Sequence, residues 1–441
     1  MQHTPLPGAT STPVRLDNGL TVVLLPEAHS HQVLVSLMLR TGSRHEREGE
    51  NGLTHMMEHL LFRGNALCPD TDALNLAFEA VGSVPNGHTS VENTGFELVA
   101  HPAHLPRALE LMAALVGSPG MYGLEKERRI LLDELAYDYN QHGALINTAA
   151  LMGRLLWPEH PLGRLVGGTP QSVQGFTGEQ VRALHQRNAH PGHMVLALAG
   201  ALEPQLAMQA VQATFGALPP PTVQDAALPM QPAPPPLNGG PRMQVVEDDD
   251  NQVHLHLAYP APGDNDPAEL AIDLLCRVLD DGPTTRLQRI IREDKALVYH
   301  IQAGYTAYSD AGQVDIVTSV QPRLLEEVLG EVRDTLGSLL SDGPTQDEVE
   351  RARMRCLFDL DFEADSLGAL VDRHAWPLLH GKVRTVEEER AALHDITREQ
   401  LHALARELFA PGRLHVVAVG PDAPAIRATL QAVLGPLTNV A

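Results

Sequence analysis

Three residues in one short segment, GLTHMMEHLLFRG, could act together on a metal ion: His55, Glu58 and His59. In a helix these positions share one face with Phe62, while the apolar side chains between them face the opposite way. Two imidazoles one turn apart can bind a single ion, and a carboxylate between them reaches the same point without being a ligand. The segment therefore predicts a metal-binding helix of the form HxxEH, the reverse of the commoner HExxH.

A third ligand must come from elsewhere, because a catalytic zinc usually takes three protein ligands and keeps a position for water. The segment LEKERRILLDELAYDYN has a strongly helical pattern and carries Glu127 and Glu134 on one face. We expect Glu134 to join His55 and His59 around one Zn²⁺ per chain. Glu58 is then the general base, taking a proton from zinc-bound water as that water attacks a carbonyl group.

Each of these patterns also has a simpler explanation. A chain with 22 histidines produces HxxEH by chance in some cases, and a salt-bridged helix surface accounts for the motif as well. The acidic pair Glu127 and Glu134, taken alone, is typical of a solvated helix face. The two segments together favour metal-dependent hydrolysis.

The composition is that of a water-soluble globular protein. Of 441 residues, 43% are hydrophobic, and no apolar run approaches the roughly 18 residues of a membrane span, so we expect no membrane partner. A formal charge of −23 argues against nucleic acid as a partner. Three widely spaced cysteines predict neither a disulfide framework nor a thiolate metal site. The N-terminal residues lack the pattern of a secretory signal, so we expect a cytoplasmic protein.

A proline-rich segment divides the chain into halves of nearly equal length. We predict an N-terminal domain over residues 1–217, a linker over 218–241 and a C-terminal domain over 242–441. Residues 32–37 and 252–257 each alternate like a half-buried strand, and each leads through a turn into a helical pattern. We therefore expect two homologous α+β domains, each a mainly antiparallel sheet with helices packed on it.

The chain resembles the pitrilysin and insulysin family of zinc peptidases, which includes the mitochondrial processing peptidases and their smaller bacterial relatives. NGLTVVLLPE and TGSRHEREGENGLTHMMEHLLFRG resemble the family's opening strand, turn and metal helix, and the likeness spans nearly the whole chain. Glu134 stands at the family's spacing for the distal zinc ligand, and Glu127 matches an acidic residue that supports the metal site. The resemblance implies a zinc-dependent endopeptidase.

Two further segments resemble family sites that contact substrate. VPNGHTSVENTGFEL resembles the stretch in which Asn86 helps to hold the substrate backbone, beside a strand edge with His88 and Thr89 that can accept a peptide as an added strand. DDGPTTRLQRIIREDKALVY resembles an Arg/Tyr pair, which implies that Arg292 and Tyr299 contact substrate near the scissile bond, the tyrosine stabilising the oxyanion. Without the resemblance, both segments are ordinary turn and surface sequence.

The chain also departs from the family pattern. Thr54 replaces the usual alanine before the first metal histidine, and Gly87-His88 replaces an alanine and an aromatic residue. The second half lacks the metal set, since Leu357 stands where the first half has Glu134. We therefore expect zinc in the N-terminal half alone.

Family members close two bowl-like halves, like a clamshell, around a chamber, and this chain corresponds to one half. Because it carries the zinc set and the Arg/Tyr pair together, the resemblance implies a homodimer in which the partner chain completes each zinc site; a heterodimer fits less well. The substrates are then peptides or unfolded segments that enter the chamber. Two rival hypotheses are a non-catalytic partner subunit of a peptidase complex and a dedicated precursor-processing peptidase.

Overall fold

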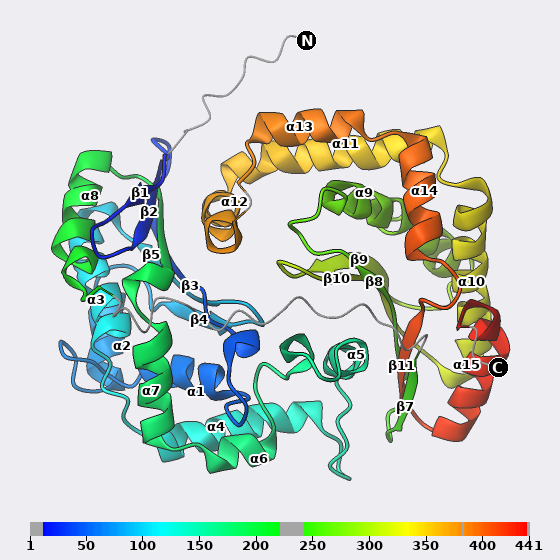
Figure 1. Ribbon diagram of the computed structural model, residues 1–441, viewed down its shortest axis with the longest axis horizontal. Helices are drawn as coiled ribbons and strands as arrows, with labels where there is room; N and C mark the ends of the chain where they lie inside the picture. The colour runs from blue at the N-terminus through cyan, green and yellow to red at the C-terminus, as the bar shows by residue number, and fades with distance from the viewer. Residues whose placement is uncertain (1–11, 221–241, 382, 439–441) are drawn as a thin grey trace. The chain divides into compact units, whose positions relative to one another are not determined.

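A computed structural model of the chain describes residues 12–220, 242–381 and 383–438 (Figure 1). Its internal contacts divide the chain into two compact units, each built on one sheet with helices packed on it. Unit 1 comprises Met1–Leu135, Arg164–Gln231 and Phe362–Val383. Unit 2 comprises Ala136–Gly163, Pro232–Asp361 and Arg384–Ala441. The predicted α+β class is confirmed.

The sheet of unit 1 has six strands in the order β1-β2-β6-β3-β5-β4. In that order they are β1 (Val14–Arg15), β2 (Thr21–Pro26), β6 (Met194–Gly200), β3 (Val33–Leu39), β5 (Thr94–Ala100) and β4 (Asn86–Thr89). Only the β2–β6 pair is parallel among these described strands. The short strand β4 therefore forms one edge of the sheet.

The sheet of unit 2 has five strands in the order β7-β11-β8-β10-β9. They are β7 (Met243–Glu247), β11 (His415–Gly420), β8 (Val253–Ala261), β10 (Gly312–Val320) and β9 (Ile301–Ala307). Here too the first pair, β7–β11, is parallel and the following pairs are antiparallel. From β2 onward, the strand order and directions of unit 1 are thus repeated in unit 2, as the weak sequence repeat predicts.

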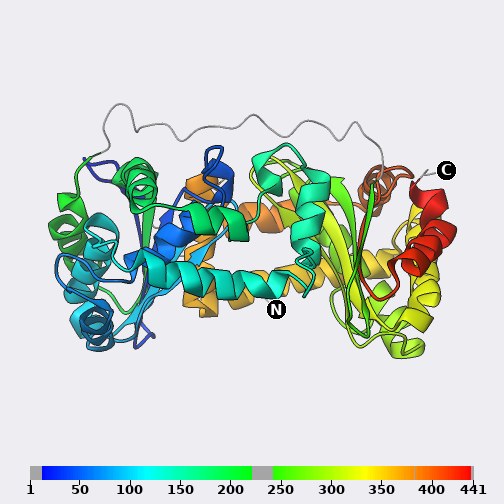
Figure 2. The same ribbon diagram turned by 90° about the horizontal axis from the view of Figure 1, so that it is seen from below.

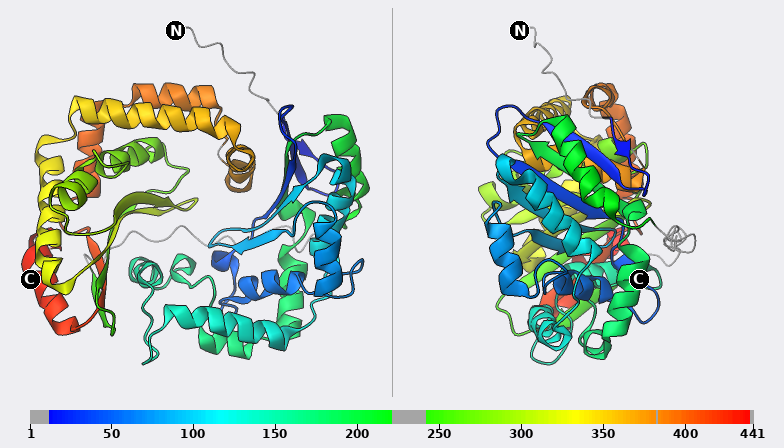
Figure 3. Two further views of the ribbon diagram at one scale, coloured as in Figure 1. Left: turned by 180° about the vertical axis from the view of Figure 1, so that it is seen from behind. Right: turned by 90° about the vertical axis from the view of Figure 1, so that its left-hand side faces the viewer.

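Eight helices belong to the described part of unit 1: α1 (Leu53–Leu61), α2 (Thr71–Glu79), α3 (Leu105–Gly117), α4 (Leu124–Leu135), α6 (Pro170–Gly175), α7 (Gly178–Asn188), α8 (Pro204–Ala213) and α12 (Leu367–His380). Helices α3 and α8 lie side by side, cyan and green in the right-hand view of Figure 3. The main core of the unit lies between the sheet and helices α1, α2, α3, α7 and α8.

Seven helices belong to the described part of unit 2: α5 (Thr148–Leu156), α9 (Glu269–Leu279), α10 (Leu325–Asp342), α11 (Gln346–Phe362), α13 (Val386–Asp395), α14 (Arg398–Leu408) and α15 (Ala423–Thr438). The core of this unit joins its sheet to helices α9, α10, α11, α14 and α15. No helix in the described parts of the chain combines the length and the apolar character needed to cross a membrane.

Each half of the sequence contributes one helix to the unit of the other half. Helix α12, from the second half, packs on β6, β3 and β2 through Val371, Ala375 and Leu379, which are spaced one turn apart. Helix α5, from the first half, packs on β11 and β8, the counterparts of β6 and β3 (Figure 2). The exchange is reciprocal, because the two helices occupy equivalent places on the two repeated sheets.

The compact units therefore differ from the predicted domain ranges 1–217 and 242–441 by two exchanged segments, 136–163 and 362–383. The predicted linker 218–241 lies outside the described residues from position 221 onward. The exchange could not be predicted from the sequence, because nothing in the sequence of either helix indicates the sheet on which it packs.

One detail of the predicted strands is wrong. The alternation in residues 32–37 predicts a half-buried strand, yet all seven residues of β3 are buried, including the polar Ser36. The strand is central in its sheet, and α12 covers the face that the pattern predicts to be solvated. Burial of the second face thus results from the helix exchange.

We predict that Ala296→Gly stabilises unit 2. Ala296 adopts φ +50° two residues after the end of the π-helix Gln288–Asp294, and an L side chain in that region costs about 1–2 kcal/mol. We expect a net gain of about 0.5–1 kcal/mol after the larger chain entropy of glycine is subtracted, measured as a raised Tm in calorimetry. The matched control Ala428→Gly, at an exposed position of helix α15, should lower Tm; an equal decrease in both variants would contradict the prediction.

Candidate active site

Helix α1 separates an apolar face from a polar one, as its sequence predicts. Met56, Met57 and Leu60 are buried in the core of unit 1. Helix α1 also packs on α7 of the same unit. The other side of α1 contacts α4 and the edge strand β4. His55, Glu58 and His59 are therefore held between two elements that lie outside the metal motif.

Helix α4 brings the third candidate ligand to the two histidines. The Nε2 atom of His55 lies 4.0 Å from Oε1 of Glu134, and Nε2 of His59 lies 3.8 Å from Oε2 of the same residue. Among the described residues, these three form the one group of histidine, cysteine or acidic side chains whose ligand atoms lie close enough together, within 4.8 Å, to share an ion.

The donor set fits zinc. Distances of 3.8–4.0 Å are too long for hydrogen bonds, yet they suit atoms placed around an ion at about 2.0–2.2 Å from each. Burial, and secondarily the neighbouring His59, lower the pKa of His55 to about 4, so its imidazole is neutral near pH 7 and can donate a lone pair. The side chain of Glu134 is 56% exposed, which leaves the ligand group open to solvent on one side.

Glu127 lies behind the candidate metal ligands. Its side chain is buried, and its Oε2 atom lies 3.0 Å from Nδ1 of His59, the nitrogen that does not face Glu134. The other oxygen pairs with the guanidinium of Arg63. The carboxylate therefore fixes which nitrogen of His59 is free to bind a metal. The sequence analysis did not predict the role of Arg63. Its position four residues after His59 could have indicated that the two side chains lie on the same side of α1.

Glu58 is buried beside the ligands without joining them. Its Oε2 lies 3.9 Å from Nε2 of His55 and accepts a hydrogen bond of 3.1 Å from the hydroxyl of Thr89 on β4. Burial raises the pKa of Glu58, and the hydrogen bond from Thr89 partly offsets this shift. A Cβ atom at Gly87 would lie 2.6 Å from Oε1 of Glu58, so a larger residue at this position would clash with the carboxylate.

The other two predicted substrate residues lie on the opposite face of β4. Successive side chains of a strand alternate, so Asn86 and His88 point away from the face on which Thr89 meets Glu58. His88 is paired with Gly95 of β5, and its imidazole lies over that glycine in space that a larger residue would fill. Both side chains are exposed on the edge strand, and neither touches the metal ligands.

Arg292 and Tyr299 belong to unit 2, whereas the candidate metal ligands belong to unit 1. Arg292 lies in the π-helix Gln288–Asp294, and its guanidinium carbon is 5.9 Å from the centre of the Tyr299 ring. Tyr299 is 91% exposed. The predicted pair is thus brought together as a cation–π contact, with the tyrosine available to a ligand.

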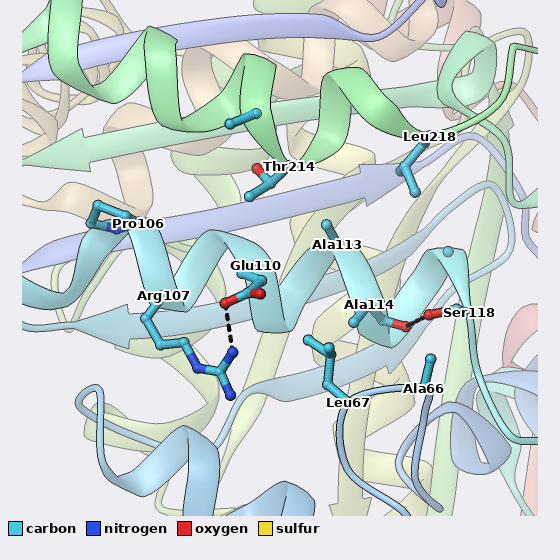
Figure 4. A pocket seen from close by; sticks show the side chains of 12 residues that line it. Ala66, Leu67, Pro106, Arg107, Glu110, Ala113, Ala114, Ser118, Thr214 and Leu218 are labelled. Carbon is cyan, nitrogen blue, oxygen red and sulfur yellow. Dashed lines mark hydrogen bonds and ion pairs between the residues drawn. The ribbon is translucent and has the colours of Figure 1, made fainter.

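A pocket in unit 1 lies away from this chemistry. It has a volume of about 580 Å³ and lies between α3 and α8, with Ala113, Ala114 and Thr214 among its lining residues (Figure 4). The charged groups in its lining are Arg107 and Glu110, which pair with each other at 2.5 Å. None of the candidate metal or catalytic residues lines it.

We predict that Glu127→Gln weakens zinc binding by about 10–100-fold, because the neutral amide cannot hold His59 and Arg63 as the carboxylate does. The measurement is the zinc Kd, obtained by competition with a chromophoric chelator. Glu125→Gln is the matched control, since Glu125 is an exposed carboxylate on the same helix that pairs with Arg128. Equal zinc affinity in wild type and Glu127→Gln would contradict the assignment.

Two family models match this chain. Residues 21–154 match the family described as insulinase (peptidase family M16), and residues 175–356 match the peptidase M16 inactive domain. A Mycobacterium tuberculosis protein described as an uncharacterized zinc protease is 30% identical over 430 residues, which cover 94% of this chain and 94% of that protein.

Two further proteins extend the comparison. The probable mitochondrial-processing peptidase subunit beta of Schizosaccharomyces pombe is 25% identical, covering 95% of this chain and 92% of that protein. The crystal structure of a protease from Helicobacter pylori has the same fold, with a TM-score of 0.85 at 21% identity over 93% of this chain and 99% of that one. The chain therefore belongs to the peptidase M16 family, a family of zinc metallopeptidases.

Proposed function

We propose that the protein is a zinc-dependent endopeptidase that hydrolyses peptides or unfolded segments, with one Zn²⁺ per chain held by His55, His59 and Glu134. One observation carries the proposal: three ligand atoms of suitable chemistry converge at one point of unit 1, and the buried carboxylate of Glu58 lies 3.9 Å from the nearest of them. When bound, zinc supplies the Lewis acid that acidifies water and polarises the scissile carbonyl.

Glu58 is suited to the role of general base. Burial raises its pKa, and a carboxylate whose pKa is raised accepts a proton from water more readily near neutral pH. The carboxylate oxygen that Thr89 holds is also the one 3.9 Å from Nε2 of His55, so the hydrogen bond directs Glu58 toward the ligand group, where the attacking water would lie. After the attack, the same group is placed to deliver its proton to the leaving amine.

We infer that the substrate binds along β4. This strand is the last in its sheet, so one side of its backbone can pair with an added strand. A peptide in that position passes Thr89 and Glu58 on the face that carries the metal set. Asn86 would hold the substrate backbone, and His88 would contact side chains that point to the other face.

We further propose a homodimer around a closed chamber, in which Arg292 and Tyr299 of one chain complete the zinc site of the other. The presence of the ligand set and the Arg/Tyr pair in the same chain supports this arrangement over a heterodimer. The exposed ring of Tyr299 supports it too, because an oxyanion donor must be free to meet substrate. Cytoplasmic location stays a prediction from the N-terminal sequence.

A second candidate is a non-catalytic subunit of a peptidase complex. The match of residues 175–356 to a domain described as inactive favours it for the second half of the chain, where Leu357 stands in place of Glu134. The first half, however, has a complete ligand set, so the catalytic proposal is preferred. A dedicated precursor-processing role is a narrower form of the same activity.

Glu58→Gln should abolish peptide cleavage while keeping zinc. Loss of a general base lowers kcat by about 10²–10⁴-fold, and Glu58 is not a ligand, so the metal content should stay near one zinc per chain. The measurement is mass-spectrometric cleavage of a mixed peptide library, with metal analysis of both proteins. Glu125→Gln serves as the control. Cleavage at the wild-type rate by Glu58→Gln would refute the base assignment, and absence of zinc from the wild type would favour the non-catalytic subunit.

Mixing two inactive variants tests the shared site. Tyr299→Phe alone should lower kcat by about 10²–10³-fold through loss of an oxyanion donor. Co-refolding it with Glu58→Gln should restore up to about one quarter of the wild-type rate, because half of the random dimers are mixed and each mixed dimer has one complete site. No recovery, in a mixture shown to form dimers, would mean that Tyr299 acts within its own chain, and an unimpaired Tyr299→Phe variant would mean that it does not act at all.

A further inference from the structure

The two candidate zinc histidines are held in different ways. Nδ1 of His59 meets the carboxylate of Glu127 at 3.0 Å, which fixes its ring directly. Nδ1 of His55 is buried and, among the described residues, has no hydrogen-bond partner. The orientation of His55 must therefore come from its backbone and from packing, and not from a group that holds the imidazole.

The backbone of His55 belongs to the first turn of α1, where a buried carboxylate takes the place of the usual cap. The helix starts after Gly52, at φ +92°, which has no side chain to accept the free N–H groups. Glu46 accepts them instead, from the N–H of Thr54 at 2.8 Å and from the N–H of Gly52 at 3.0 Å. Glu46 is only 1% exposed.

Neighbouring residues lock this cap in position. Asn51 donates to the Glu46 carboxylate at 3.4 Å and to the carbonyl of Leu165 at 2.7 Å, and Arg164 donates to the main-chain oxygen of Glu46. Gly52 packs so closely on the segment after Leu165 that a Cβ atom there would lie 2.6 Å from Cα of Gly168. The start of α1 thus has little freedom to shift.

Burial of a charged carboxylate at this position is energetically unfavourable. Burial raises the pKa of Glu46 to about 7, and no cation pairs with its side chain in the described parts of the chain. A glutamine would avoid the buried charge, but its side chain has only one acceptor oxygen. Three donors converge on Glu46: the main-chain N–H groups of Gly52 and Thr54 and the side-chain amide of Asn51. Glutamate therefore supplies the two acceptor oxygens that these groups need.

We propose that Glu46 is a positioning residue of the metal centre: through the N–H groups of Gly52 and Thr54 it sets the first turn of α1 and so aims the His55 imidazole at the metal. The inference rests on the proposed zinc site. Glu46 positions His55 as Glu127 positions His59. Glu46 acts through the main chain of α1, whereas Glu127 contacts the imidazole ring.

The test compares Glu46→Gln with Glu50→Gln in the full-length chain. Glu50 lies in the same loop and pairs with Arg187 at 2.7 Å, but its carboxylate does not accept from α1, so it is a matched control. Zinc Kd is measured by chelator competition at about pH 8, where Glu46 is ionised, and the absorption spectrum of the Co²⁺-substituted proteins is recorded. Circular dichroism checks the fold of each protein.

We expect Glu46→Gln to bind zinc about 10–100-fold more weakly and to change the Co²⁺ ligand-field bands, while Glu50→Gln matches the wild type. If Glu46→Gln does not fold, Glu46→Asp replaces it, because the shorter carboxylate cannot reach both N–H groups. Unchanged zinc affinity and spectrum in a folded Glu46 variant would overturn the inference and leave the proposed function standing. Equal weakening in Glu50→Gln would overturn it as well. A wild type that binds no zinc would remove the proposed function itself.

Discussion

The packing of α4 against α1 is the contact on which the candidate active site depends. It buries Glu127 against His59 and Arg63, and it brings Glu134 to the point where the two histidines converge. Neither helix holds the candidate ligand group alone, since α1 carries two of its members and α4 the third. The apolar side of α1, buried in the core of unit 1, keeps the helix from turning away from α4.

Buried carboxylates recur around this contact, and each is matched to donors in a different way. Glu127 has a guanidinium and an imidazole, Glu58 has the Thr89 hydroxyl, and Glu46 has main-chain N–H groups. Burial raises the pKa values of Glu58 and Glu46, whose donors are mainly neutral. Buried acidic groups are therefore concentrated near the point where the candidate ligands could hold a divalent cation.

The repeated fold shows how one architecture can serve two purposes. Both units keep the same strand order, and both accept a helix from the other half of the sequence. Only unit 1 holds a ligand group among the described residues, whereas the matching helix of unit 2 has Leu357. Unit 2 instead presents Arg292 and Tyr299 from a π-helix and the loop after it, a type of distortion frequent at functional sites.

The sequence alone determined the family resemblance, the α+β class and the residues of the metal motif, because these depend on local spacing. Glu58 and His59 lie three and four residues after His55, about one helical turn, so the common face of the three side chains follows from helix geometry without knowledge of the fold. Glu134 needed one more step, the helical pattern of a second segment that carries Glu127 and Glu134 on one face, and the structure places it beside both histidines.

Tertiary structure decided what lies between distant segments. That α12 covers β3, that Arg63 clamps Glu127, that Gly87 makes room for Glu58 and that Glu46 caps α1 are all contacts between separate elements. A carboxylate seven residues before the start of a helix has no local sequence pattern that distinguishes a helix cap from a solvated loop residue. Its role is set by burial, and burial is a property of the packed chain and not of the residue type.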